Sequence, residues 1–110
     1  MSVALGRIQQ LAEYVALGGD AAENRVLELA LDKIMAREES RLVAQRTRLQ
    51  AQLTEFERRY NLSSADFYHR FEQGDMGDDA DFVEWSATYE MVENLNARLV
   101  ILRDKRSDKR

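Results

Sequence analysis

The 110-residue chain contains no cysteine and no proline, and only five of its residues are glycine. Without cysteine it cannot form a disulfide framework or a thiolate metal site. Without proline its helices can run uninterrupted, and the abundant Ala, Leu, Glu and Arg favour helices. The composition therefore predicts one all-α domain in a reducing compartment, and we expect the cytoplasm.

Long apolar runs are also missing from the sequence. No stretch approaches the roughly 20 apolar residues that a membrane-spanning helix needs. The amino terminus lacks the basic and apolar pattern of a signal peptide. We therefore expect no membrane association.

Aromatic residues are scarce outside one stretch of the chain. Eight of the nine lie between Phe56 and Tyr89, and only Tyr14 lies outside. The same stretch contains an acidic loop bracketed by Gly74 and Gly77. The sequence therefore places its largest apolar side chains beside its densest negative charge.

Basic residues are nearly absent from the same region. Between Asn61 and Ala97 there are nine acidic residues and one basic residue, Arg70, so this segment carries −8 while the whole chain carries −4. Such a surface repels nucleic acid and attracts a basic protein, and salt weakens both effects. We expect a protein partner and no direct binding of nucleic acid. The alternative is a solvated helix face that keeps the protein soluble.

The amino-terminal half predicts a helical hairpin. A helix over residues 2–17 has an apolar stripe that a neighbour can bury; its members are Leu5, Ile8, Leu11, Ala12 and Val15. Gly18 and Gly19 end this helix, and Asp20 is placed to cap the next one. No glycine follows before residue 61, so we expect a second helix of about 40 residues and about 60 Å.

This long helix carries an apolar stripe with steps of three and four residues, which is typical of coiled-coil-like packing. Its members are Leu27, Leu31, Ile34, Met35, Leu42, Leu49, Leu53, Phe56 and Tyr60. Arginines outnumber acidic residues in the middle of the helix, and we interpret that middle as exposed. The alternatives are a subunit contact and a charge-matched seam against the acidic segment.

A short third helix is expected after a turn. Asn61 can adopt the left-handed conformation that ends the long helix. Ser63 or Ser64 is expected to cap the third helix, and Gly74 to end it.

A fourth helix is expected from about residue 80, with Asp78 or Asp79 as its cap. One apolar stripe contains Trp85, Thr88, Val92, Leu95, Leu99 and Leu102, and a wider surface adds Phe82, Tyr89, Met91, Val100 and Ile101. Because this surface is wider than one stripe, we expect neighbours on more than one side of the helix.

Together these elements predict antiparallel helical hairpins around one long central helix. Residues 1–60 form the first hairpin, residues 61–103 hold the aromatic and acidic motif with the final helix, and residues 104–110 form a charged tail. A long helix with short neighbours at both ends offers a seam for a second copy, so we expect a homodimer.

The acidic loop and the single histidine are the candidates for chemistry. Clustered carboxylates can bind Ca²⁺ or Mg²⁺, but the loop lacks the glycine and terminal glutamate of an EF-hand, and helix capping explains Asp78, Asp79 and Asp81. No serine-hydrolase, phosphate-loop or dinucleotide motif is present. We predict no catalytic residue, no metal site and no cofactor. The alternative is a metal-dependent or acid-base enzyme that uses this loop, Asp75 included, with His69.

Residues 56–91, FERRYNLSSADFYHRFEQGDMGDDADFVEWSATYEM, resemble a pattern found in small uncharacterised helical proteins of bacteria and archaea. The matching positions are Phe56, Tyr60, Ser63, Ser64, Phe67, Tyr68, Phe71, Gly74, Gly77, Asp78, Asp81, Phe82, Glu84 and Trp85. Asn61 stands where that pattern more often has glycine. Several such proteins are suspected antitoxin components of toxin–antitoxin loci, so the resemblance implies a protein-binding role.

The same segment supplies the predicted contact residues. An acidic and aromatic surface would suit the nucleic-acid groove of a basic, ribonuclease-like toxin. We expect the contacts to come from Phe67, Tyr68, Phe71, Asp75, Asp78, Asp79, Asp81, Phe82, Glu84, Trp85 and Tyr89. The aromatic row around Trp85 is typical of a core, but Trp and Tyr are also enriched in binding hot spots. A helical scaffold that assembles a larger complex is a further alternative.

Overall fold

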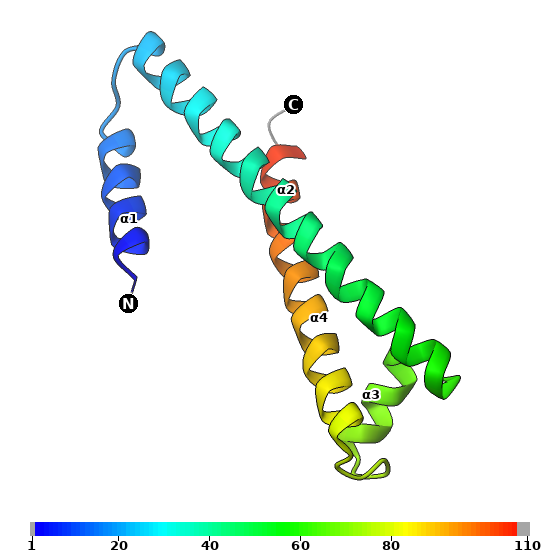
Figure 1. Ribbon diagram of the computed structural model, residues 1–110. Coiled ribbons are helices and arrows are strands. Elements are labelled where there is room, and N and C mark those ends of the chain that lie inside the picture. The colour runs from blue at the N-terminus through cyan, green and yellow to red at the C-terminus, as the bar shows by residue number, and fades with distance from the viewer. Residues whose placement is uncertain (1, 108–110) are drawn as a thin grey trace. The chain divides into compact units, whose positions relative to one another are not determined.

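The computed structural model describes residues 2–107, with side chains as far as residue 103. Its elements are four helices, α1 Val3–Ala16, α2 Ala21–Tyr60, α3 Ser64–Glu72 and α4 Ala80–Ser107 (Figure 1). The predicted all-α fold with one long helix is confirmed. None of these helices is long and apolar enough to cross a membrane.

The chain divides into two compact units, Met1–Ala36 and Arg37–Arg110, which we call unit 1 and unit 2. Unit 1 contains α1 and the first turns of α2. Unit 2 contains the rest of α2 together with α3 and α4. Of the predicted charged tail, α4 includes residues 104–107, and residues 108–110 lie outside the described part.

Local sequence signals determine the ends of α1 and α2. The Oγ of Ser2 accepts a hydrogen bond from the backbone N–H of Leu5 at 3.0 Å. The carboxylate of Asp20 accepts one from the backbone N–H of Glu23 at 2.8 Å, as the sequence predicted. Asn61 has φ of 51°, the left-handed conformation expected after α2.

The caps of α3 and α4 distinguish between the predicted alternatives. Ser63, not Ser64, caps α3, because its Oγ accepts from the N–H of Asp66 at 3.1 Å. Before α4, the Oδ1 of Asp79 accepts from the N–H of Asp81 at 2.9 Å. The predicted starts of α3 and α4 are therefore confirmed, and so are the side-chain caps that determine them.

The core of unit 2 lies between α2, α3 and α4. One cluster contains Leu53, Phe56, Phe67, Trp85 and Val92, and a second contains Leu42, Leu95 and Leu99. In Figure 1, α3 lies between the end of α2 and the start of α4. The two long helices run antiparallel, because Asp81 of α4 contacts Arg59 while Arg103 contacts Glu39.

The charged middle of α2 is less exposed than the sequence suggested. Leu42 is 1% exposed. Beside it, Glu39 pairs with Arg103 at 2.8 Å, and Arg46 donates to the Oδ1 of Asn96 at 2.8 Å. The middle of α2 therefore packs against α4 through Leu42 and these polar contacts, while Arg37, Arg41 and Arg48 remain exposed, and no pair between its arginines and an acidic residue of the segment 61–97 is formed by these contacts.

Helix α4 is covered on one side only, which corrects the expectation of neighbours on several sides. The stripe that includes Trp85 and Leu99 is buried against α2 and α3. Met91, Val100 and Ile101 remain exposed because no described residue of unit 2 covers that side. Part of the apolar surface of α4 is therefore left to solvent.

The apolar stripe of α1 is also exposed. The sequence predicted that the start of α2 would bury it, but α1 has no buried residue. Ile8, at the centre of the stripe, is 61% exposed. The start of α2 therefore does not bury this stripe, and the described residues of unit 1 form no hairpin core.

Candidate partner-binding surface

Trp85 lies at the centre of the aromatic cluster in unit 2. Its ring stacks on that of Phe67 with 3.9 Å between ring centroids, and on that of Phe56 at 5.4 Å. Its Nε1 donates to the buried Oγ of Ser64 at 2.9 Å. Phe67 and Trp85 are both 0% exposed, so neither ring has a free face to offer a partner. For these two predicted contact residues, the structure supports the core interpretation.

Four other predicted contact residues, Tyr68, Phe71, Phe82 and Tyr89, form the half-buried rim of this cluster. The rings of Tyr68 and Tyr89 lie 4.8 Å apart. The hydroxyl of Tyr68 donates to Glu90 at 2.5 Å. This hydrogen bond to a carboxylate, followed by burial, raises the pKa of Tyr68 to about 12. The rim joins α3 to α4 and is the part of the aromatic cluster that a partner can reach.

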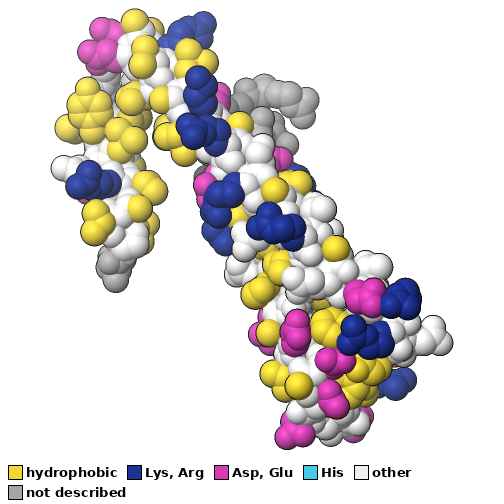
Figure 2. All heavy atoms as spheres, viewed as in Figure 1, with side chains coloured by type: hydrophobic (Ala, Val, Ile, Leu, Met, Phe, Trp, Pro, Cys, Tyr) yellow, Lys and Arg dark blue, Asp and Glu magenta, His cyan; other side chains and the backbone are white. Residues whose placement is uncertain are grey.

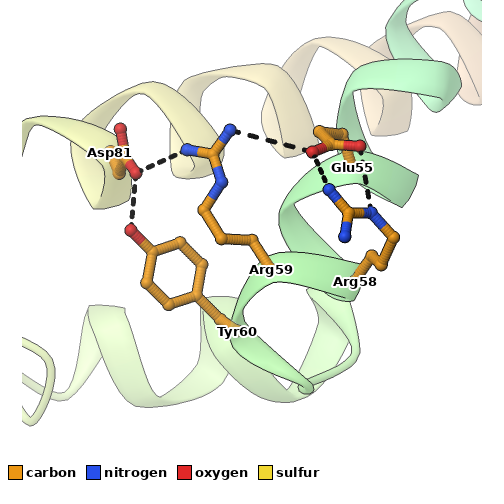
Figure 3. Close-up of polar contacts among 5 residues, drawn as sticks. All are labelled: Glu55, Arg58, Arg59, Tyr60 and Asp81. Carbon is orange, nitrogen blue, oxygen red and sulfur yellow. Dashed lines mark hydrogen bonds and ion pairs between the residues drawn. The ribbon is translucent and has the colours of Figure 1, made fainter.

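A polar network joins the end of α2 to the start of α4 (Figure 3). The Oδ2 of Asp81 accepts from the hydroxyl of Tyr60 at 2.5 Å and from Nη1 of Arg59 at 2.8 Å. Nη2 of Arg59 lies 3.8 Å from Glu55, which also pairs with Arg58 at 2.5 Å. Asp81, a predicted contact residue, is therefore already paired with a cation of its own chain.

We expect Asp81→Asn to remove a pH-dependent contribution to stability. Hydrogen bonds from Tyr60 and then from Arg59 lower the pKa of Asp81 below its ordinary value of 3.8. A carboxylate of this kind stabilises the fold above its unfolded pKa, and the contribution is lost as pH falls through the folded pKa. Urea midpoints of the two proteins should differ at neutral pH and converge as the pH falls below 3.8. A difference that persists unchanged as the pH falls well below 3.8 would contradict the assignment.

Three predicted acidic contact residues are free for a partner. Asp75, Asp78 and Glu84 are exposed, and their carboxylates make no hydrogen bond or ion pair within the described residues. Asp79 is also exposed, but one of its oxygens caps α4. The negative charge that is available to a partner therefore comes mainly from the loop and the first turns of α4.

The acidic loop is held in place at several points. Gly74 and Gly77 both have positive φ, of 83° and 79°, which glycine adopts at little cost. The N–H of Asp75 donates to the carbonyl of Arg70 at 3.0 Å. The side chain of Met76 is half-buried and packs against the aromatic cluster. These contacts fix the backbone that presents Asp75 and Asp78.

Sequence reasoning missed the outer side of α4. Beside the acidic residues, Val83 is 50% exposed and Met91 is 46% exposed. A groove of about 340 Å³ lies where this part of α4 meets α2, lined by Gln45, Ala87, Glu90, Met91, Asn94, Leu95 and Arg98. The sequence gives no clear signal for this surface, because the positions four and seven residues after Val83 are Ala87 and Glu90.

The alternative of a metal-dependent enzyme gains no supporting observation. Among the side chains of residues 2–103, no group of three or more His, Cys, Asp or Glu is placed to hold a metal ion. His69 is exposed on α3. A melting temperature raised by Mg²⁺ or Ca²⁺ would favour this alternative, because a ligand that binds only the folded state stabilises it.

No protein-family model matches the chain, and no curated protein or solved structure matches it. The pattern in residues 56–91 therefore remains a resemblance, and the function has to be inferred from the surface itself.

Proposed function

We propose that the protein is a non-enzymatic interaction module that binds a basic protein through the acidic side of unit 2. The observation that carries this proposal is the set of exposed carboxylates without partners in the described chain, Asp75, Asp78 and Glu84. Charges left uncompensated at a surface attract a partner of opposite sign and orient its approach. Along the sequence, Arg70 is the one basic residue between residues 61 and 97, and Arg59, which lies beside this segment, is already paired with Asp81.

Apolar side chains beside these charges give the surface a means of tight contact. Val83 and Met91 are each about half exposed on α4. The half-buried rings of Tyr68 and Tyr89 belong to the same unit. A protein interface combines an apolar centre with a polar rim. Most of its binding energy comes from a few residues near that centre.

The scaffold under this surface favours binding at low entropic cost. The stack of Phe67 on Trp85 and the network around Asp81 connect α3 and α4 to α2. Groups that are held in place before binding lose little freedom when the partner arrives. We therefore assign partner binding to the acidic loop and the outer side of α4.

The class of partner follows from charge and from the resemblance in residues 56–91. A basic ribonuclease-like toxin has a nucleic-acid groove of the opposite charge to this surface, and an acidic protein in that groove would block it. We propose that the protein neutralises such a toxin. The resemblance in residues 56–91 supports the toxin as the partner. The exposed carboxylates support only the more general proposal, that the partner is a basic protein.

We expect the triple variant Asp75→Asn, Asp78→Asn, Glu84→Gln to lose its partner. Tagged protein would be purified at low salt from the cells that produce it, and the bound proteins identified and quantified by mass spectrometry. The wild type should retain a basic protein in stoichiometric amount and release it as salt rises. Removing three surface charges should reduce the retained amount about tenfold or more.

The matched control neutralises three exposed carboxylates of unit 1, with the substitutions Glu13→Gln, Glu23→Gln and Glu28→Gln. It changes the net charge by the same amount, so it separates the acidic surface from the total charge of the chain. Retention of the partner by the control alone supports the proposal. Equal retention by both variants would refute it.

A further inference from the structure

Unit 1 exposes more apolar surface than a solitary helical hairpin can leave in water. Figure 2 shows hydrophobic side chains over α1 and over the first turns of α2. Ten large apolar residues of this unit are exposed: Val3, Leu5, Ile8, Tyr14, Val15, Leu17, Val26, Leu29, Leu31 and Ile34. These residues belong to unit 1, whereas the acidic residues belong to unit 2, and the inference below does not depend on the proposed function.

Three of the exposed apolar residues of α1 form one face of the helix, while Val3 and Tyr14 lie on the other side. Leu5, Ile8 and Val15 follow one another at helical spacing, whereas Gln10 and Glu13 lie on the opposite side. A helix of about 14 residues is marginal in water unless its apolar face is covered. The stability of α1 therefore requires a neighbour on this face.

The first turns of α2 have two apolar sides. Val26 and Leu29 are three residues apart and share one side, while Leu31 and Ile34 share another. Leu29 and Leu31 differ by about 200° around the helix axis, because each residue advances the helix by about 100°. Helix α1 can cover only one of these sides. The other needs a helix that unit 1 does not contain.

The size of unit 1 leads to the same requirement. A chain of fewer than about 40 residues usually needs disulfides, metals or oligomerisation to fold, and unit 1 covers 36 residues. The chain has no cysteine, and its described residues contain no group placed to hold a metal ion. Oligomerisation is one of the means by which so small a unit can bury its apolar residues.

The exposed apolar area is that of a protein interface. From their exposed fractions, the ten side chains present on the order of 1,000 Å² in total, spread over more than one side of α1 and of α2, whereas a standard interface buries about 800 Å² per partner. One copy of unit 1 therefore has enough apolar surface for a stable contact with another.

The charge of unit 1 is compatible with self-association. Its three basic residues, Arg7, Arg25 and Lys33, nearly balance its five acidic residues, for a net charge of −2. A basic partner is attracted far less to this unit than to the segment of charge −8 in unit 2. Two copies of unit 1 therefore meet with little repulsion.

We propose that the protein is a homodimer in which α1 and the first turns of α2 from two copies pack into a four-helix bundle. Short loops join antiparallel neighbours in such bundles, and residues 17–20 form a short connection of this kind. The two-fold symmetry of a dimer places each residue in the interface twice, so one substitution changes the contact at two points.

Sedimentation equilibrium of the purified full chain tests this dimer. The wild type should have a mass of about 25 kDa, twice the 12.7 kDa of one chain. Ile8→Asp, on the apolar face, should give the 12.7 kDa monomer. Gln10→Asp, on the opposite side of the same helix, adds the same charge and should leave the dimer intact.

A second variant removes apolar area without breaking the helix. Alanine is the strongest helix former, so Ile8→Ala keeps α1 while it shortens the buried side chain. We expect the dissociation constant of the dimer to rise at least about tenfold, since two isoleucines lose their burial. A wild-type mass of 12.7 kDa would refute the second copy as the occupant of these faces, and so would a dimer that neither Ile8 variant weakens.

Discussion

Trp85→Ala should lower the free energy of unfolding by about 3–5 kcal/mol, the typical cost of truncating a buried aromatic residue. The indole is 0% exposed, stacks on Phe67 and Phe56, and donates to Ser64. Its removal leaves a cavity and a buried hydroxyl without its donor. Because native domains are stable by only about 5–15 kcal/mol, this is a large part of the stability expected for unit 2.

Urea unfolding followed by far-ultraviolet circular dichroism measures this loss, since the variant has no tryptophan to report by fluorescence. Two milder variants separate the contribution of ring stacking from that of the hydrogen bond to Ser64. Trp85→Phe keeps a ring in the stack, and Ser64→Ala keeps the indole but leaves its Nε1 unsatisfied, at a cost of about 1–3 kcal/mol. A loss of less than about 1 kcal/mol in Trp85→Ala would show that the ring is not part of the core.

The position of Trp85 also determines how partner binding has to be tested. A substitution at this residue would disturb the fold and any interface together, so reduced binding would have no single cause. The exposed carboxylates Asp75, Asp78 and Glu84 avoid this difficulty, because their removal leaves the core unchanged.

Leu42→Ala should lower the stability of unit 2 by about 2–5 kcal/mol, the usual range for a buried leucine. Leu42 is 1% exposed and packs in one cluster with Leu95 and Leu99 of α4. Trp85 is the only tryptophan and lies in unit 2, so its fluorescence during urea unfolding reports this unit. The midpoint of that transition should fall clearly in the variant.

Leu29→Ala is the matched control on the same helix. It makes the same substitution at a residue that is 61% exposed and belongs to unit 1. The transition reported by Trp85 should keep its midpoint in this variant. Equal shifts in both variants would contradict the placement of Leu42 in the core.

The ends of the helices could be predicted because each depends on a few neighbouring residues. Asp20 and Ser63 cap helices through bonds to N–H groups three residues away, and Asn61 ends α2 through its own φ angle. These interactions are local, so the sequence contains them almost completely. The four helices, including the long α2, follow from these local interactions.

Burial could be predicted only in part, because it depends on which helices meet. Leu42 lies among charged residues, and its burial follows from the antiparallel register that brings Leu95 and Leu99 to it. A tryptophan such as Trp85 can be a core residue or a binding hot spot, and the sequence does not distinguish the two roles. Its packing on Phe67 in the structure places it in the core. For the candidate surface, the acidic charge was visible in the sequence, while the half-exposed Val83 and Met91 were missed.

Purification of the tagged full chain from its native cells at low salt, followed by mass spectrometry, tests the central claim most directly. The proposed interaction predicts one small basic protein in stoichiometric amount, released as the salt concentration rises. Recovery of the chain without any partner would contradict it, and so would a partner that stays bound regardless of salt.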